Sequence, residues 1–138
     1  MMSNRPEVSK SNPYWISKHR FYELKHFCLQ YPEWEKAAND ISLRIRSQSY
    51  ERIGLHGNKV DDPVYDCVAQ RDKYIQKMGM VITSAKEASD GLGCYILIAV
   101  TKGLSYDDLR VSWRIPCCKE LYYEVYRRFF KILSEKRG

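Results

Sequence analysis

Glycine and proline are scarce in this chain, with 7 glycines and 5 prolines among 138 residues. Such a composition excludes a turn-rich all-β fold and a largely disordered chain. No run of 18 apolar residues occurs, so the sequence predicts no membrane-spanning helix. The opening stretch MMSNRPEVSKSNP also has no apolar segment of the kind found in secretory signals. We therefore expect a cytoplasmic protein with no membrane partner.

Metal-binding and redox motifs are equally few. The five cysteines form no C-x-x-C pair, and an odd number without a secretory signal indicates reduced thiols. The adjacent Cys117 and Cys118 suit neither a metal site nor an ordinary disulfide, and we interpret them as small residues at a helix start. The three histidines are His19, His26 and His56, and the first two lie two helical turns apart, too far to share one metal ion without other ligands. No nucleophile–base pair is evident, so we expect no enzyme, no metal and no cofactor.

The chain does have a moderate apolar content and a positive charge. Hydrophobic residues make up 44%, which is enough for the core of one domain. The 23 lysines and arginines exceed the 17 acidic residues, giving a net charge of +6. Counted by segment, the net charge is +3 over residues 1–61, −1 over 62–101 and +4 over 102–138. The basic surplus therefore lies toward the two ends, as in a protein that meets a polyanion.

Apolar residues recur at helical spacing through most of the chain and predict an all-α fold. Residues 1–12 are expected to be disordered. The sequence Ser11-Asn12-Pro13 predicts a helix start, because a side-chain cap precedes a proline in the first turn. Two helices that meet at Tyr31-Pro32 are expected to form an N-terminal hairpin over residues 13–47. Glycines at positions 54 and 57 then predict a linker over residues 48–61.

A long central helix is predicted from the cap at Asp61-Asp62-Pro63. Its apolar residues form a near-heptad seam that can pack on a helix of this chain or of a second copy, and we expect a homo-oligomer. The seam consists of Val64, Cys67, Val68, Tyr74, Ile75, Met78, Val81, Ile82 and Ala85. The following run CYILIAVTK is short enough for a buried strand or a buried helix, and the Gly103 after it favours a helix with a glycine stop.

The last third of the chain has the order of a helix-turn-helix, in which the second helix enters the major groove. Ser105 would cap a short helix over residues 105–112, a tight link would follow at 114–116, and residues 117–136 would form a long helix. Leu109 and Trp113 are expected to face Ile115. The inner face of the last helix is expected to hold Leu121, Val125, Phe129 and either Ile132 or Leu133.

The outer face of that helix provides the candidate DNA-binding residues: Cys118, Lys119, Glu120, Tyr123, Arg127, Arg128 and Lys131. Lys119, Tyr123 and Arg127 recur every four residues and form one ridge. Of these, Cys118, Lys119, Glu120 and Tyr123 would approach base edges. The other three, Arg127, Arg128 and Lys131, would meet the phosphate backbone. Glu120 and Glu124 could accept a hydrogen bond from cytosine or pair with neighbouring basic side chains.

At these residues the chain resembles small phage-encoded regulators of the ArpU/RinA type, over roughly residues 62–136. The matching features are Ser105, Leu109, Ile115-Pro116, Tyr122-Tyr123 and Arg127-Arg128, whereas Cys117-Cys118 replaces the usual Ser or Thr. The resemblance implies a region similar to the promoter-reading part of sigma factors. It also implies a phage or prophage transcriptional regulator that binds double-stranded DNA in the host cytoplasm, with host RNA polymerase as a partner.

Two other functions fit the same layout. A small terminase subunit, which packages DNA, shares the helix-turn-helix but assembles into rings. A phage protein-interaction module that inhibits a host factor would bind no duplex. The mass in solution distinguishes a dimeric regulator from a ring of eight or more copies, and a duplex-binding assay at low salt distinguishes both from the third function.

Overall fold

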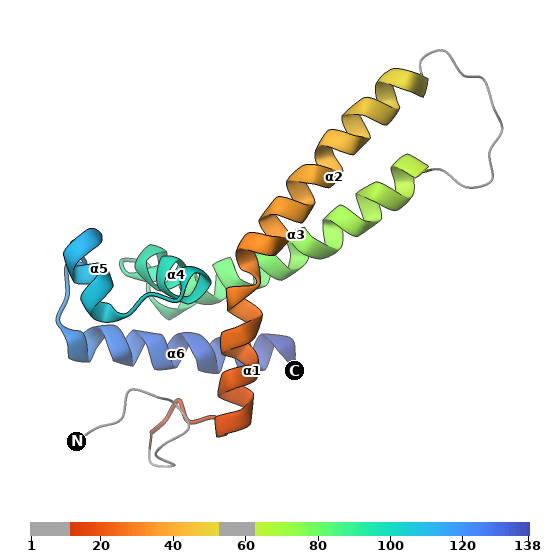
Figure 1. Cartoon of the computed structure of the whole chain (residues 1–138). Coiled ribbons are helices and arrows are strands. Elements are labelled where there is room, and N and C mark those ends of the chain that lie inside the picture. Colours follow the sequence, from red (N-terminus) through yellow and green to blue (C-terminus); the bar gives the residue numbers. More distant parts are fainter. Residues whose placement is uncertain (1–11, 53–62) are drawn as a thin grey trace. The chain divides into compact units, whose positions relative to one another are not determined.

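A computed structural model describes residues 12–52 and 63–138, and these residues form six α-helices and no strand (Figure 1). The predicted all-α fold is confirmed. Residues 1–11 and 53–62 lie outside the described residues, and with them the expected disordered N-terminus and most of the expected linker, including His56. The helices are α1 (Lys18–Leu29), α2 (Tyr31–Arg52), α3 (Pro63–Ala88), α4 (Gly93–Lys102), α5 (Tyr106–Ser112) and α6 (Lys119–Arg137).

The helices belong to two compact units. The hairpin unit spans Tyr31–Gly79 and holds α2 with the first part of α3. The terminal unit holds α1, the end of α3 from Met80, and α4, α5 and α6. The predicted hairpin of residues 13–47 is thus divided, because α1 belongs to one unit and α2 to the other.

The first helix begins five residues later than the Ser11-Asn12-Pro13 sequence predicts. Asn12 forms a local turn instead, in which its Oδ1 accepts a hydrogen bond from the Tyr14 amide at 2.9 Å and its carbonyl accepts one from Trp15 at 3.0 Å. The helix starts at Lys18, where the Ser17 hydroxyl accepts from the Arg20 amide at 3.4 Å. An Asn before Pro suits a turn as well as a cap, and here the turn is not continued as a helix.

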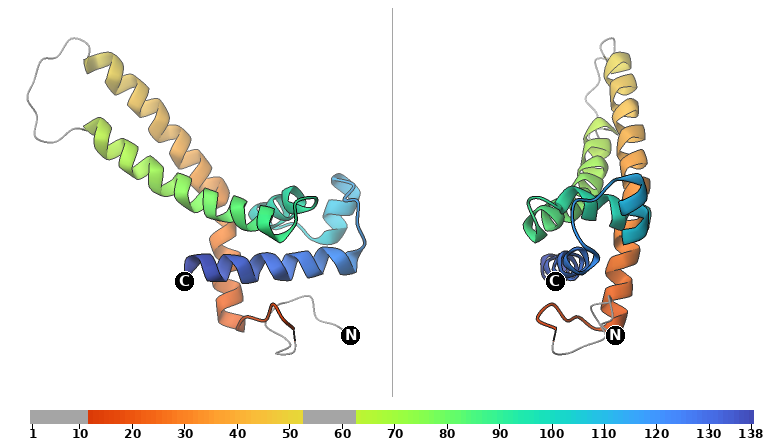
Figure 2. Two further views of the ribbon diagram at one scale, coloured as in Figure 1. Left: turned by 180° about the vertical axis from the view of Figure 1, so that it is seen from behind. Right: turned by 90° about the vertical axis from the view of Figure 1, so that its left-hand side faces the viewer.

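In the hairpin unit, α2 and α3 lie side by side and run in opposite directions (Figures 1 and 2). Helix α2 continues to Arg52, so residues 48–52 are helical rather than part of the predicted linker. Trp34, Ala38 and Ile41 form a buried stripe on α2. The Lys77 ammonium of α3 lies 5.7 Å from the centre of the Trp34 ring, a cation–π distance.

The seam predicted along α3 is buried only in part. Val81 and Ala85 are buried in the terminal unit, and Cys67 is buried in the hairpin unit. Ile75 and Ile82 remain 47% and 41% exposed. A heptad seam needs one partner along its whole length, whereas the two ends of α3 belong to different units.

The core of the terminal unit forms where α1 and α4 pack on each other and on α6. Phe21 of α1 meets Phe130 of α6 edge to face, with 5.0 Å between ring centres. Cys28 of α1 is fully buried, and burial raises the pKa of its thiol to about 12. Arg20 fixes α1 to the end of α6, because it donates to the hydroxyl and the carbonyl oxygen of Ser134 at 3.1 and 2.9 Å.

The apolar run before Gly103 forms helix α4 and ends as the sequence predicts. Gly103 adopts φ 70° and ψ 37°, the left-handed conformation that closes many helices. The Leu104 amide then donates to the Ala99 carbonyl at 2.9 Å. This glycine stop reverses the chain and leads it into α5.

Candidate nucleic-acid interface

Helix α5 is short, and a reciprocal cap defines its start. The Ser105 hydroxyl accepts from the Asp108 amide at 3.2 Å, while the Asp108 carboxylate accepts from the Ser105 amide at 3.0 Å. This capping box satisfies two amides that the first helical turn leaves free. The predicted Ser105 cap and the short helix are therefore confirmed.

The link between α5 and α6 is compact. Four residues separate Trp113, the C-cap of α5, from Cys118, the N-cap of α6. Counted between the helices, residues 113–118 form a six-residue link, somewhat longer than the three- to four-residue turn of a typical helix-turn-helix. The Ile115 amide donates to the Leu109 carbonyl at 3.3 Å, and the Tyr106 hydroxyl donates to the Cys117 carbonyl at 2.7 Å. Residues 105–136 are thus two helices with a fixed corner, not one continuous rod.

The side chains at this link differ in burial. Leu109 and Ile115 are buried, whereas Trp113 is 42% exposed. The Lys102 ammonium lies 5.3 Å from the centre of the Trp113 ring, a cation–π distance. That Trp113 faces Ile115 stays a prediction.

The buried face of α6 is rotated from the predicted one. Val125, Phe129 and Leu133 are buried as expected, but Leu121 is 44% exposed. Two aromatic side chains, Tyr122 and Phe130, are buried in its place. Helix α6 contacts both α1 and α4, so its apolar residues must cover a wide arc of its surface. This wide contact explains why the buried face is rotated. The aromatic residues Tyr122, Tyr126 and Phe130, four apart, were the sequence signal for this arc.

The predicted ridge keeps an accessible edge. Lys119 is exposed, and Tyr123 and Arg127 are half-buried. Their spacing of four residues keeps the three on one side of α6. Of the other candidates, Cys118 and Glu120 are exposed and Lys131 is half-buried. Within the described part of the chain, Lys119, Arg127 and Lys131 form no ion pair.

Arg128 has a different environment from the other candidates. Its Nε donates to the Tyr14 hydroxyl at 3.2 Å, and one terminal nitrogen donates to the Ala88 carbonyl at 2.9 Å. Its guanidinium also lies 5.5 Å from the centre of the Tyr14 ring and 3.8 Å from a Glu124 carboxylate oxygen. Arg128 therefore connects α6 to the end of α3 and to the segment before α1. Two of its hydrogen bonds are thus made within the protein.

Metal chemistry finds no support in the described residues. They contain no group of three or more His, Cys, Asp or Glu side chains placed to hold a metal ion. His19 and His26 are exposed on α1, and the five cysteines are free thiols. No helix in the described ranges is long and apolar enough to cross a membrane.

Comparison of the chain with family models, with curated proteins and with solved structures found no match. The resemblance to the ArpU/RinA type thus remains an expectation that depends on the residues named above.

Proposed function

We propose that this protein binds duplex DNA through α5 and α6 and acts as a transcriptional regulator of a phage or prophage. One observation carries the proposal: a capped short helix, a four-residue corner and a long helix that keeps a basic edge accessible. This is the order of elements that places a second helix in the major groove. The proposal includes the host cytoplasm as the site of action and host RNA polymerase as a partner.

The position of each side chain along α6 suggests its role. Cys118, Lys119 and Glu120 lie at the N-terminal end, the part of a recognition helix that approaches base edges. Arg127 and Lys131 lie two to three turns further on, where a helix in the groove passes the phosphate backbone. Tyr123 lies between these sets and can donate to a phosphate. Arg128 has no DNA contact in this proposal, because its hydrogen bonds stabilise the fold.

Self-association is part of the proposal. Two copies of a helix-turn-helix read two half-sites, which raises both affinity and specificity. Ile82 of the terminal unit supports this step, since this large apolar side chain of α3 is 41% exposed. A symmetric contact between two copies would cover it.

Selection from a random duplex pool tests the proposal. The full chain is mixed with random duplexes, bound fragments are recovered and sequenced, and the enriched site is confirmed by gel shift. We expect an enriched motif with two half-sites. Absence of enrichment, together with no duplex binding at low salt, would reject the DNA-binding function.

A second function is favoured by three exposed apolar side chains around the α5–α6 corner. Val111 is 80% exposed, Trp113 42% and Leu121 44%. Large apolar side chains are depleted from surfaces that meet only water, and they are common where proteins meet proteins. A protein-interaction module that inhibits a host factor would use these residues rather than the basic edge. Substitution of Val111 by Ser would then abolish the partner contact and leave duplex affinity unchanged.

A further inference from the structure

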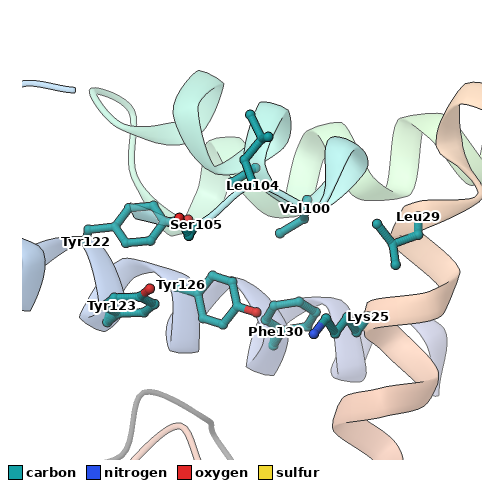
Figure 3. A pocket seen from close by; sticks show the side chains of 11 residues that line it. Lys25, Leu29, Val100, Leu104, Ser105, Tyr122, Tyr123, Tyr126 and Phe130 are labelled. Atoms are coloured by element: carbon teal, nitrogen blue, oxygen red, sulfur yellow. The ribbon is translucent and has the colours of Figure 1, made fainter. Parts of the chain in front are cut away.

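A cavity lies inside the terminal unit, between α1, α4 and α6 (Figure 3). Helix α1 contributes Lys25 and Leu29, and the end of α4 with the turn after it contributes residues 99, 100 and 103–105. Helix α6 contributes four aromatic rings, Tyr122, Tyr123, Tyr126 and Phe130. The cavity volume is about 250 Å³. A site of this size takes a small molecule, not a macromolecule.

The walls of the cavity are suited to an aromatic ring. Val100 and Leu29 provide apolar surface opposite the tyrosine rings. Tyr122 and Tyr123 meet edge to face with 4.9 Å between ring centres, and Tyr126 meets Phe130 in the same way at 4.8 Å. A cavity of roughly 150 Å³ lined by apolar side chains can bind benzene. That cavity is enclosed, whereas this pocket is partly open to solvent, and its volume leaves room for a single ring with one substituent.

Lys25 faces this space and is the one cation of the lining among the residues that the structure describes. Lys25 is exposed, and its ammonium has no hydrogen bond or ion pair among them. In Figure 3 the Lys25 amine points from α1 toward Phe130 and Tyr126 of α6. No acidic side chain of the described ranges lines the cavity. The lining thus combines aromatic faces, one positive charge and tyrosine hydroxyls, which together favour a ring that carries a negative charge.

We propose that this cavity binds a small monocyclic aromatic carboxylate, with the ring between the tyrosines of α6 and α4 and the carboxylate at Lys25. Such sites use a mostly apolar lining for affinity and a few polar groups for orientation. The two groups that would hold the ligand's charge and one side of its ring, Lys25 and Val100, lie outside the proposed DNA edge.

The position of the cavity nevertheless allows a bound molecule to regulate DNA binding by the accessible edge of α6. Tyr123 lines the cavity and is also the middle residue of the Lys119–Tyr123–Arg127 ridge. Ser105 lines it too, and this residue caps α5. An occupant would contact both helices of the helix-turn-helix and change DNA affinity, a consequence that rests on the proposed function.

The test uses benzoate as the probe and the full chain labelled with ¹⁵N. We expect saturable NMR shifts of residues around the cavity with a Kd on the order of millimolar, as befits about nine non-hydrogen atoms. Benzylamine, which has the ring with the opposite charge, and acetate, which has the charge without the ring, should each bind more weakly. No saturable shift with benzoate, or equal binding of benzylamine, would overturn the proposal.

Two matched variants locate the carboxylate. Lys25→Met should weaken benzoate binding by about threefold or more, the effect of losing one partly exposed charge contact. Lys18→Met removes an exposed lysine of the same helix that does not line the cavity, and it should leave the affinity unchanged. An equal loss in both variants, or none in Lys25→Met, would assign the binding elsewhere. Because no DNA is present, this result does not depend on duplex binding, and a gel shift with and without benzoate then tests regulation separately.

Discussion

Arg127 and Arg128 are neighbours in α6 but have different surroundings. Arg128 donates to Tyr14 and to the end of α3, whereas Arg127 forms no ion pair within the described residues. The sequence suggested the same role for both, because both lie away from the apolar stripe. The difference comes from Ala88, whose carbonyl oxygen is brought to α6 only by the tertiary fold. Long-range contacts of this kind leave no local sequence signal.

Arg127→Ala should weaken duplex binding, because it removes a cation from the accessible edge of α6. We expect a loss of about five- to tenfold in affinity, typical of one phosphate or base contact. A gel-shift titration at fixed salt measures it. Arg44→Ala, which removes an exposed arginine from α2, is the control with the same charge change. Equal affinities for Arg127→Ala and the unaltered protein would remove Arg127 from the interface.

Arg128→Met should destabilise the fold and leave the DNA affinity of the folded protein unchanged. Methionine keeps part of the aliphatic stem but loses the hydrogen bonds to Tyr14 and Ala88, at a cost of about 1 kcal/mol given the partial exposure of the guanidinium. Urea denaturation measures the change, with Arg127→Met as the control. A stable Arg128→Met protein that fails to bind DNA would show that Arg128 contacts the duplex.

At the scale of single elements, the end of α4 and the start of α5 were more predictable than the helices that pack together. Ser105 and Gly103 act where the sequence placed them, because caps and glycine stops depend on a few adjacent residues. The partner of α1 was not predictable in this way. Its buried face, with Phe21, Leu24 and Cys28, suits any apolar surface of matching shape, and in the structure it packs on α4 and α6.

Gly79 gives a prediction for α3. It lies inside the helix, and an added methyl group would meet nothing within 4 Å. Gly79→Ala should raise the free energy of unfolding by about 1 kcal/mol, because alanine loses less backbone entropy in a helix. Thermal denaturation measures the shift. Gly103→Ala is the opposing control: its φ of 70° disfavours a side chain, and it should lower stability by about 1 to 2 kcal/mol.

At the scale of the whole molecule, the sequence predicted the class and most helices but not their grouping. Helical periodicity is a local property, so the all-α fold and the span of α3 could be predicted from it. The pairing of α2 with α3, and of α1 with α4 and α6, depends on which apolar faces meet after collapse. The exposed edge of α6 could also be predicted from helical periodicity. The exact set of buried residues on α6 could not, because it depends on the helices that α6 packs against.

The net charge of +6 gives a prediction for the whole chain in its complex with DNA. If Arg127 and Lys131 each neutralise one phosphate, the logarithm of the affinity should fall with the logarithm of salt concentration with a slope of about −2 per bound copy. Gel shifts over a range of salt concentrations measure this slope. A slope near zero would be incompatible with an electrostatic contact along α6.

Because Cys28 is fully buried, its alkylation reports on opening of the terminal unit. Alkylating reagents attack the thiolate, and burial both keeps reagents away from Cys28 and raises its pKa to about 12. Cys94 and Cys118 are exposed, so they should be alkylated in the folded protein within the first minutes of treatment, as mass spectrometry of peptides can follow. Cys28 should be alkylated only when the terminal unit opens. The rate of Cys28 alkylation would then measure the rate of that opening without any added label.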